Sequence, residues 1–257
     1  YLQGSLKTLL DALLPKLESM GVELISNSKV EELIIEKQKI KGVKTQKETH
    51  EAEQVVLTIP SIYMKDLFLL HSEKLAGDVS RVEYFGAVCV ILEMKKPLSD
   101  IYWLNVADKN FPFGGIIEQT NFVHPELYGN RHIAYLSRYF TEDEAIAQMS
   151  EEEVKKLMLE KLPEIYPNYQ SDEVLEVHVF KTKTAATVCD LNFSQKVMPA
   201  KLPIQGLCLA NMMHIYPDER SVNNSIRVAA EACRVMKINA DFVPDGSSLT
   251  GQIGFGK

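Results

Sequence analysis

The sequence predicts an α/β (mixed α+β) protein in which a strand-rich domain is inserted into a second, discontinuous domain. Three observations support this class. Residues 1–60 combine a helical repeat of leucines with short apolar strands. Strand-like segments then follow one another from residue 82 to residue 140. After Pro199 and Pro203, an apolar strand and a helix return. We therefore expect residues 1–60 and 201–240 to form one domain and residues 61–200 the other.

The chain opens with a predicted amphipathic helix. Its apolar residues recur at helical spacing at Leu6, Leu9, Leu10, Leu13, Leu14 and Leu17. Ser5 is the expected N-cap and Gly21 the expected C-terminal stop. The apolar residues 22–26 then predict a short strand.

A hairpin and a buried strand follow. Residues 30–36 and 40–45 read as antiparallel partners around the polar turn Lys37–Lys39. Residues 53–59 form a near-continuous apolar run, as in a parallel strand buried on both faces. Pro60 ends this strand.

The middle of the chain predicts a mostly antiparallel or mixed sheet. A short helix is expected over residues 61–70. The expected strands cover residues 82–94, 101–106, 115–122, 132–140 and 174–189, separated by turn residues. Capping-box patterns at residues 141–144 and 150–153 predict two helix starts, and the second helix should run to about Leu162.

The C-terminal part predicts a strand, a polar turn and a helix. The strand covers residues 206–210 and the helix residues 222–237, with Ser221 as N-cap. One helix face carries Val222, Ile226, Ala229, Ala230, Cys233 and Met236. A helix N-terminus after a buried strand offers free N–H groups and a dipole to an electron-rich ligand. Residues 241–257 are rich in Gly and Ser and are expected to be a flexible tail.

The composition excludes several classes. The 257 residues are 46% hydrophobic and 25% charged with a net charge of −7, which argues against a nucleic-acid-binding surface. We see no signal peptide and no apolar run long enough to span a bilayer. The four cysteines lack CxxC spacing, so we expect buried, reduced thiols and a cytoplasmic location. The six histidines form no metal-binding pair, so no metal site is expected.

Two blocks carry a family resemblance. The first runs from Gln3-Gly4-Ser5 through the leucine helix and the hairpin to Val55-Val56-Leu57-Thr58-Ile59-Pro60. The second runs from Gly206 to Arg227. Together they resemble the flavin-containing amine oxidase superfamily, which includes protoporphyrinogen oxidases. Residues 112–122 and 210–223 are most similar to a protoporphyrinogen-oxidase-like or UDP-galactopyranose-mutase-like group.

The sequence departs from the superfamily pattern in two ways. It contains no GxGxxG fingerprint for the FAD pyrophosphate. We therefore expect the chain to be the C-terminal portion of a longer protein, or the partner of a separate N-terminal piece. The second departure is Ala210-Asn211, where much of the superfamily has Gly-Asp. Asn can hydrogen-bond a hydroxyl group but brings no charge.

The resemblance implies an incomplete FAD-binding, Rossmann-like domain with an inserted substrate domain. It implies FAD as a noncovalent cofactor of the intact protein. The implied cofactor-binding residues are Val30, Pro60, Ala210, Asn211, Arg220, Val222 and Asn223. The alternatives are core packing for Val30, an ordinary turn for Asn211, a capped surface helix after Ser221, and a solvated ion pair of Arg220 with Glu219.

Substrate-binding candidates come from the middle of the chain. Glu118 and Asn121, with the nearby Thr120 and His124, lie at the end of a predicted strand. Tyr139 and Tyr216 are candidate aromatic walls. An exposed strand face and half-buried packing tyrosines are the alternatives. No nucleophile–base pair is found, as expected where the cofactor carries the chemistry.

We therefore predict part of an FAD-dependent oxidoreductase that transfers a hydride equivalent from a small-molecule substrate to flavin. A redox-neutral, sugar-mutase-like flavin enzyme is one alternative. The other is a non-catalytic binding or assembly module that cannot hold FAD alone. Open strand edges and apolar faces predict self-association or association with a missing N-terminal segment.

Overall fold

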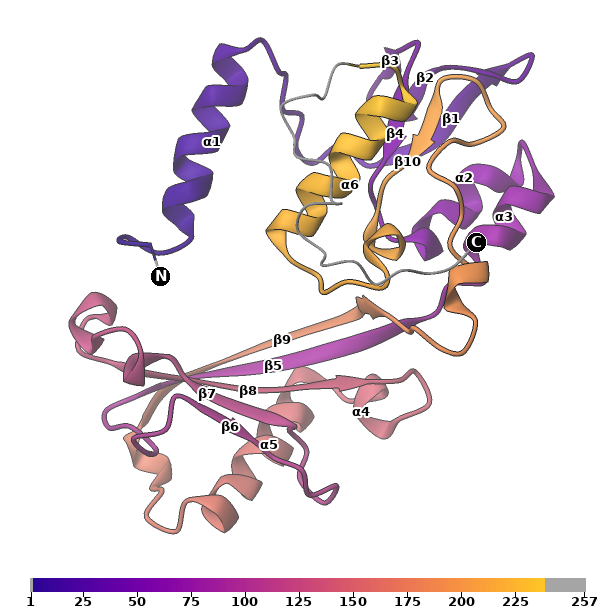
Figure 1. The fold of residues 1–257 in the computed structure, drawn as a ribbon. Helices are drawn as coiled ribbons and strands as arrows, with labels where there is room; N and C mark the ends of the chain where they lie inside the picture. Colours follow the sequence, from indigo (N-terminus) through magenta and orange to yellow (C-terminus); the bar gives the residue numbers. More distant parts are fainter. Residues whose placement is uncertain (1, 239–257) are drawn as a thin grey trace, which may run out of the picture.

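The computed structural model describes residues 2–238 (Figure 1). The tail expected over residues 241–257 lies outside the described residues. Figure 1 shows a long sheet below and a second body above it, which the strands β5 and β9 connect.

The N-terminal helix α1 (Lys7–Ser19) forms as predicted. Gly21, with φ +84°, ends it in the left-handed conformation that glycine tolerates best. Ser5 is not the N-cap: the helix begins one residue later, with Leu6 at that position and no side-chain cap. The leucine stripe makes no core, since five of its six residues are exposed and none is buried. The strand predicted over residues 22–26 is wrong, because this segment has no partner strand and is exposed.

The predicted hairpin is confirmed. Strand β1 (Val30–Glu36) pairs antiparallel with β2 (Lys39–Thr45), which pairs with β3 (Thr49–Glu51). Lys37 and Gln38 both take positive φ angles, 48° and 61°, as the tight hairpin turn between right-twisted strands requires.

A two-stranded parallel sheet brings together segments far apart in the sequence. Strand β4 (Val55–Leu57) pairs with β10 (Leu207–Leu209), which confirms the parallel arrangement expected for residues 53–59. Helix α6 (Val222–Val235) packs against β10 through Cys208, Val228 and Ala232. The prediction that this strand is buried on both faces is wrong, because Val56 of β4 is 40% exposed.

The five-stranded sheet has the strand order β6-β7-β8-β5-β9 and is antiparallel throughout. Its strands are β5 (Tyr84–Met94), β6 (Trp103–Asn105), β7 (Gly115–Glu118), β8 (His132–Phe140) and β9 (Val174–Thr187). All five lie within the predicted strands, and β8 matches its prediction at both ends.

Helix α5 (Glu151–Ile165) covers one face of this sheet. Val154, Met158 and Leu162 of the helix are buried in one cluster with Val88, Val90 and Leu92 of β5. The predicted capping box is confirmed, since Ser150 and Glu153 exchange side-chain-to-backbone hydrogen bonds. The helix continues past Leu162 and contains Pro163.

The helix start predicted at Thr141 is wrong. The Glu144 carboxylate does accept a hydrogen bond from the Thr141 N–H, but the short helix α4 (Ala145–Gln148) begins only after Glu144. The remaining elements are α2 (Lys65–Leu69), α3 (Glu73–Val79) and the 3-10 turns η1 (Ser61–Met64), η2 (Gln119–Asn121), η3 (Pro125–Tyr128), η4 (Ser171–Glu173), η5 (Phe193–Gln195) and η6 (Met212–Ile215).

The buried residues gather in separate clusters. One cluster joins residues 33–82 with residues 193–213, and another lies between the five-stranded sheet and α5. The first cluster thus includes residues on both sides of position 60, and the domain boundaries at 60 and 201 stay a prediction. Among the described helices, none has both the length and the apolar character that crossing a bilayer demands.

Candidate functional site

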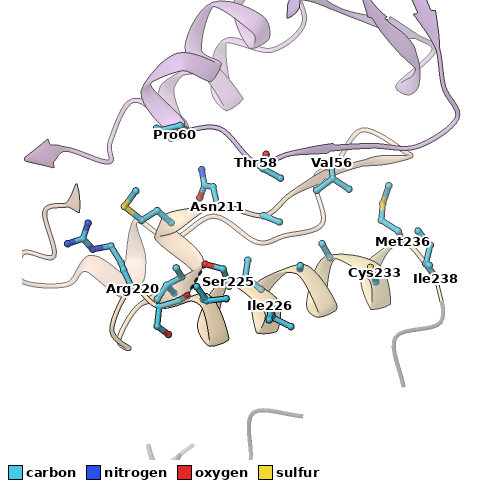
Figure 2. A pocket seen from close by; sticks show the side chains of 18 residues that line it. Val56, Thr58, Pro60, Asn211, Arg220, Ser225, Ile226, Cys233, Met236 and Ile238 are labelled. Atoms are coloured by element: carbon cyan, nitrogen blue, oxygen red, sulfur yellow. Dashed lines mark hydrogen bonds between the residues drawn. The ribbon is translucent and has the colours of Figure 1, made fainter. Parts of the chain in front are cut away.

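The first pocket lies between α6 and the ends of the parallel strands, with a volume of about 1050 Å³ (Figure 2). Val56, Thr58 and Pro60 form one wall. The facing wall is a stripe of α6 made of Val222, Ser225, Ile226, Ala229, Cys233 and Met236. The predicted apolar face of α6 therefore lines the pocket except at Ala230, which is buried in the protein. The buried residues Val228 and Ala232 also line it.

Asn211 lies on the first pocket just after β10 and is only 6% exposed. Its Nδ2 group donates to the Ile59 carbonyl (3.0 Å) and to Ser61 Oγ (3.2 Å). Its Oδ1 atom accepts from the Met213 N–H (3.2 Å). Both amide protons are thus used, and Oδ1 keeps one lone pair with which to accept a hydrogen bond from a ligand.

His214 supports this turn from behind. Its Nδ1 atom accepts from the Asn211 N–H (3.2 Å), so Nε2 carries the proton and donates to the Met198 carbonyl (2.9 Å). Burial lowers the pKa of His214, which keeps the ring neutral. The turn that positions Asn211 therefore depends on an uncharged histidine.

The N-terminus of α6 also reaches the first pocket. Ser221 and Val222 line it, and Ser221 caps the helix as predicted by accepting from the Asn224 N–H (3.2 Å). The N–H groups of Val222 and Asn223 precede the first intrahelical hydrogen bonds, so they remain available. The Asn223 side chain is exposed and does not line the pocket.

The second pocket, of about 870 Å³, lies on the face of the five-stranded sheet opposite α5. Strand register places Ser137 and Cys89 side by side there, and Tyr139 beside Ala87. Trp103, Asn105 and Ala185 also line it. A planar apolar body with a few polar groups would suit this wall.

Arg220 joins the two pockets. Its side chain lines the first pocket, while its guanidinium donates to the Ala185 carbonyl (2.5 Å) and to Tyr139 Oη (2.8 Å) on the second. The guanidinium lies 5.7 Å from the Tyr139 ring centroid, within the range of a cation–π contact. The predicted residues Arg220 and Tyr139 are thus brought together, and the ion pair with Glu219 is not formed.

Glu118 and Asn121 have a structural role. The buried Glu118 carboxylate accepts from the N–H groups of Leu98 and Ser99 and from Ser99 Oγ. Asn121 donates to the carbonyls of Ser99 and Ile101. Both residues therefore hold the loop before β6, and neither lines the two pockets described above.

The other predicted residues lie apart from both pockets. Thr120 Oγ1 accepts from the Ile133 N–H, and His124 is exposed. Tyr216 is 40% exposed and packs edge-on against Phe193, with ring centroids 5.1 Å apart. Val30 is half-buried at the start of β1 against the core, which agrees with the packing alternative.

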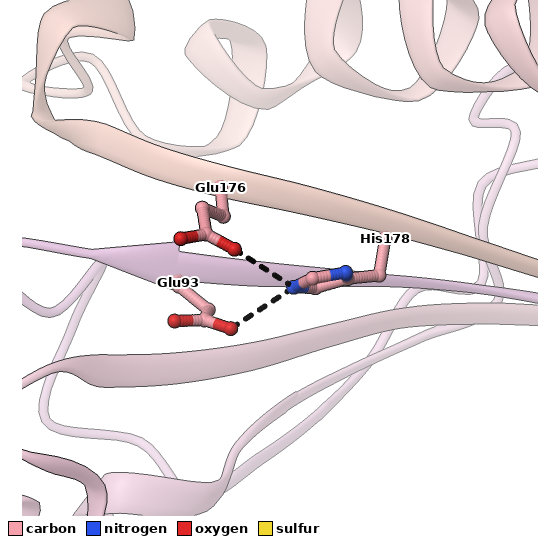
Figure 3. A group of neighbouring side chains, drawn as sticks. All are labelled: Glu93, Glu176 and His178. Atoms are coloured by element: carbon pink, nitrogen blue, oxygen red, sulfur yellow. Dashed lines mark hydrogen bonds and ion pairs between the residues drawn. The ribbon is translucent and has the colours of Figure 1, made fainter.

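One group of side chains in the described chain has donor atoms close enough for a metal ion: Glu93, Glu176 and His178 (Figure 3). His178 Nε2 lies 2.9 Å from Glu93 and 3.7 Å from Glu176. The Arg131 guanidinium donates to both carboxylates, and with His178 it lowers the pKa of Glu93. An arginine already supplies the countercharge, so the group is best described as an ion-pair network.

All four cysteines are free. Cys208 is buried, Cys89 and Cys233 are half-buried, and Cys189 is exposed. The prediction that all four thiols are buried is therefore wrong. Burial raises the pKa of the Cys89 and Cys208 thiols, which disfavours the reactive thiolate.

Comparisons with known proteins show the family and the fold of the chain. A family model described as flavin containing amine oxidoreductase matches residues 1–234. No curated protein matches the chain in sequence. Similar solved structures include an oxidoreductase from Methanosarcina mazei (20% identity, TM-score 0.63, 82% of this chain and 50% of that one). A putative protoporphyrinogen oxidase from Exiguobacterium sp. 255-15 is similar too (14% identity, TM-score 0.69, 89% of this chain and 50% of that one). A reduced UDP-galactopyranose mutase is also similar (9% identity, TM-score 0.70, 93% of this chain and 52% of that one). The chain spans about half the length of these structures.

Proposed function

Because the chain belongs to the flavin containing amine oxidoreductase family, we propose that it forms the substrate-facing part of an FAD-dependent oxidoreductase. The reaction we propose transfers a hydride equivalent from a small-molecule substrate to the flavin. One observation carries the proposal: the pocket at the N-terminus of α6 adjoins the pocket on the open sheet face through the contact of Arg220 with Tyr139.

The first pocket fits a flavin chemically. Pro60, Ala210 and Val222 offer apolar contact for a planar ring. Asn211 Oδ1 can accept from a hydroxyl group, and the N–H groups of Val222 and Asn223 can donate to an electron-rich oxygen. FAD supplies the hydride-accepting chemistry when bound. The positive end of the α6 dipole would favour the negative charge that a flavin gains on reduction.

The second pocket provides a surface for the substrate. Tyr139 and Trp103 are the exposed aromatic residues on its wall, and Ser137 of β8 and Asn105 of β6 are polar residues there. These residues would orient a substrate next to the first pocket and exclude water from the apolar side of that substrate. We keep Tyr139 in the substrate site and leave Glu118, Asn121 and Tyr216 out of it.

A redox-neutral use of the flavin is the second candidate. The similarity of the fold to a UDP-galactopyranose mutase favours keeping it. The two candidates differ in electron balance, because a redox-neutral enzyme regenerates its flavin without an external acceptor. Reduction of bound FAD by a substrate, followed as loss of the yellow absorbance without oxygen, would favour the oxidoreductase.

Flavin binding to the chain itself tests the proposal directly. Riboflavin and FAD are titrated against the purified chain, and flavin fluorescence reports binding. We expect both to bind, and Ala229→Phe, which fills the first pocket, to weaken binding about tenfold or more. Glu231→Phe, at an exposed position of the same helix that does not line the first pocket, is the matched control. A chain that binds neither flavin would favour the third reading, a non-catalytic module that cannot hold FAD alone.

Exposed apolar surface supports a proposal about partners. The α1 leucines are 45–63% exposed at positions 6, 9, 10, 13 and 14, and β4 leaves one strand edge unpaired within the described chain. We propose that another polypeptide segment, from a second copy or from the parent protein, covers this surface. A monomer in size-exclusion chromatography with light scattering would contradict self-association. A cytoplasmic location also stays a proposal, which the free cysteines favour.

A further inference from the structure

Arg220 differs from the other five arginines of the chain in its partners. Each of the others forms an ion pair with a carboxylate: Arg81 with Asp78, Arg131 with Glu93 and Glu176, Arg138 with Glu144, Arg227 with Asp218, and Arg234 with Glu231. Within the described residues, no carboxylate lies at ion-pair distance from Arg220. In a chain of net charge −7, a positioned arginine without a carboxylate partner is a distinctive feature.

The guanidinium of Arg220 is held in place by neutral groups. One terminal nitrogen donates to the Ala185 carbonyl and the other to Tyr139 Oη. A guanidinium has five N–H donors, so three remain for a ligand. Neutral partners fix the direction of these donors without cancelling the positive charge, which favours recognition of an oxyanion.

The surroundings of Arg220 favour an anionic ligand with an apolar body. Asp108, Lys109, Arg138 and Glu144 are the charged residues of the second pocket. Glu144 is neutralised by Arg138, and Asp108 and Lys109 bring one charge of each sign. Within the described residues, Arg220 therefore has no carboxylate partner at the junction, and it lies beside the Tyr139 ring of the second pocket.

We propose that Arg220 binds an oxyanion group, a carboxylate or a phosphate, of a substrate whose apolar body lies against Tyr139 and Trp103 in the second pocket. This inference rests on the proposed function, because it assigns the second pocket to the substrate. It implies that the substrate is an anion and not a simple amine. It also assigns Arg220 to the substrate and not to the flavin.

The chain offers a built-in reporter for the test. Trp103 is its only tryptophan and lines the second pocket. Four probes of one size are titrated while Trp103 fluorescence is followed: benzoate, phenylphosphate, benzyl alcohol and benzylamine. We expect the wild-type chain to bind one or both anions about tenfold more tightly than the alcohol, and the amine no more tightly than the alcohol. The two anions separate carboxylate from phosphate recognition.

Three variants assign the effect to Arg220. Arg220→Gln should abolish the anion preference, and Arg220→Lys should keep only part of it, because lysine has the charge without the planar fork. Arg81→Gln, which removes the same charge at a residue that lines neither pocket, should leave the preference unchanged. Equal binding of amine and anions, no saturable response to any anion, or an unchanged preference in Arg220→Gln would overturn the proposal.

The same variant separates this inference from the proposed function. Arg220→Gln should bind riboflavin and FAD like the wild type, because the guanidinium that the variant removes is held by Ala185 and Tyr139 at the second pocket. Weaker flavin binding with an intact anion preference would assign Arg220 to the cofactor and refute the substrate role. Loss of flavin binding in the wild type, with anion preference present, would refute only the flavin proposal.

Discussion

Replacing Asn211 by Asp is the sharpest test of the geometry at the first pocket. The carboxylate would keep the acceptor for the Met213 N–H, and the Ser61 hydroxyl could turn to donate to it. It would lose the donor to the Ile59 carbonyl and place an oxygen opposite that carbonyl at 3.0 Å. A substitution that restores the acid typical of the superfamily should therefore destabilise this chain.

The expected cost of Asn211→Asp follows from this one contact. Leaving a buried acceptor unsatisfied costs about 1–3 kcal/mol. Because the Ile59 residue is 41% exposed, we take the middle of that range, about 2 kcal/mol. In a chain of this size each kcal/mol shifts Tm by about 2–4 °C, so Tm should fall by about 4–8 °C at pH 7.

The assay for Asn211→Asp is thermal unfolding followed by circular dichroism at several pH values. Burial and the facing carbonyl should raise the pKa of the new carboxyl in the folded state above its unfolded value of about 3.9. The folded variant then keeps its proton to higher pH than the unfolded chain, so the loss of Tm should shrink as pH falls. Asn223→Asp, exposed in the first turn of α6, should leave Tm unchanged or slightly higher. A variant as stable as the wild type at pH 7, or a pH-independent loss, would refute the reasoning.

Two further predictions use neighbouring features. Gly86→Ala should lower Tm by several degrees, because its Cβ would lie 2.3 Å from the Phe140 ring. Gly77→Ala has open space around its Cβ in helix α3 and should raise Tm slightly. Equal Tm values for the two variants would contradict this packing. Because burial lowers the pKa of His214, the unfolded chain takes up a proton before the folded one, so stability should be complete above about pH 6.5 and fall below it. His214→Gln, which can still donate to the Met198 carbonyl, should flatten this pH dependence of Tm, and an unchanged slope would show that other groups cause it.

The elements that could be predicted are those whose signals are local. The strand over residues 132–140 alternates residues for two faces, and the box Ser150–Glu153 closes within one turn of helix. The failures are local patterns that did not decide the structure. Residues 22–26 have strand composition but no neighbouring strand, and Thr141–Glu144 makes its side-chain contact without starting a helix.

The site could be predicted only in part for the same reason. Family motifs identified Pro60, Ala210 and Asn211, which line one pocket. They gave no indication of Trp103, although the alternation along β8 and β5 could have suggested an open face carrying Tyr139 and its neighbours. Glu118 looked like a ligand because it is polar at a strand end, but the loop 98–99 uses its carboxylate. Sequence position does not reveal whether a polar side chain is already satisfied.

The two pockets are joined by a largely buried hydrogen-bond network and by the exposed contact of Arg220 with Tyr139. The difference in burial between them bears on the role of Arg220. Asn211 donates to Ser61, which accepts from Tyr84 at the start of β5, so a largely buried network links the first pocket to a strand that lines the second. This network can hold the pockets in register without Arg220. The arginine is exposed, so binding a ligand oxyanion through its remaining N–H donors would disturb no core contact. Its substitution should therefore change ligand preference while Tm stays close to that of the wild type, the opposite of what Asn211→Asp should do.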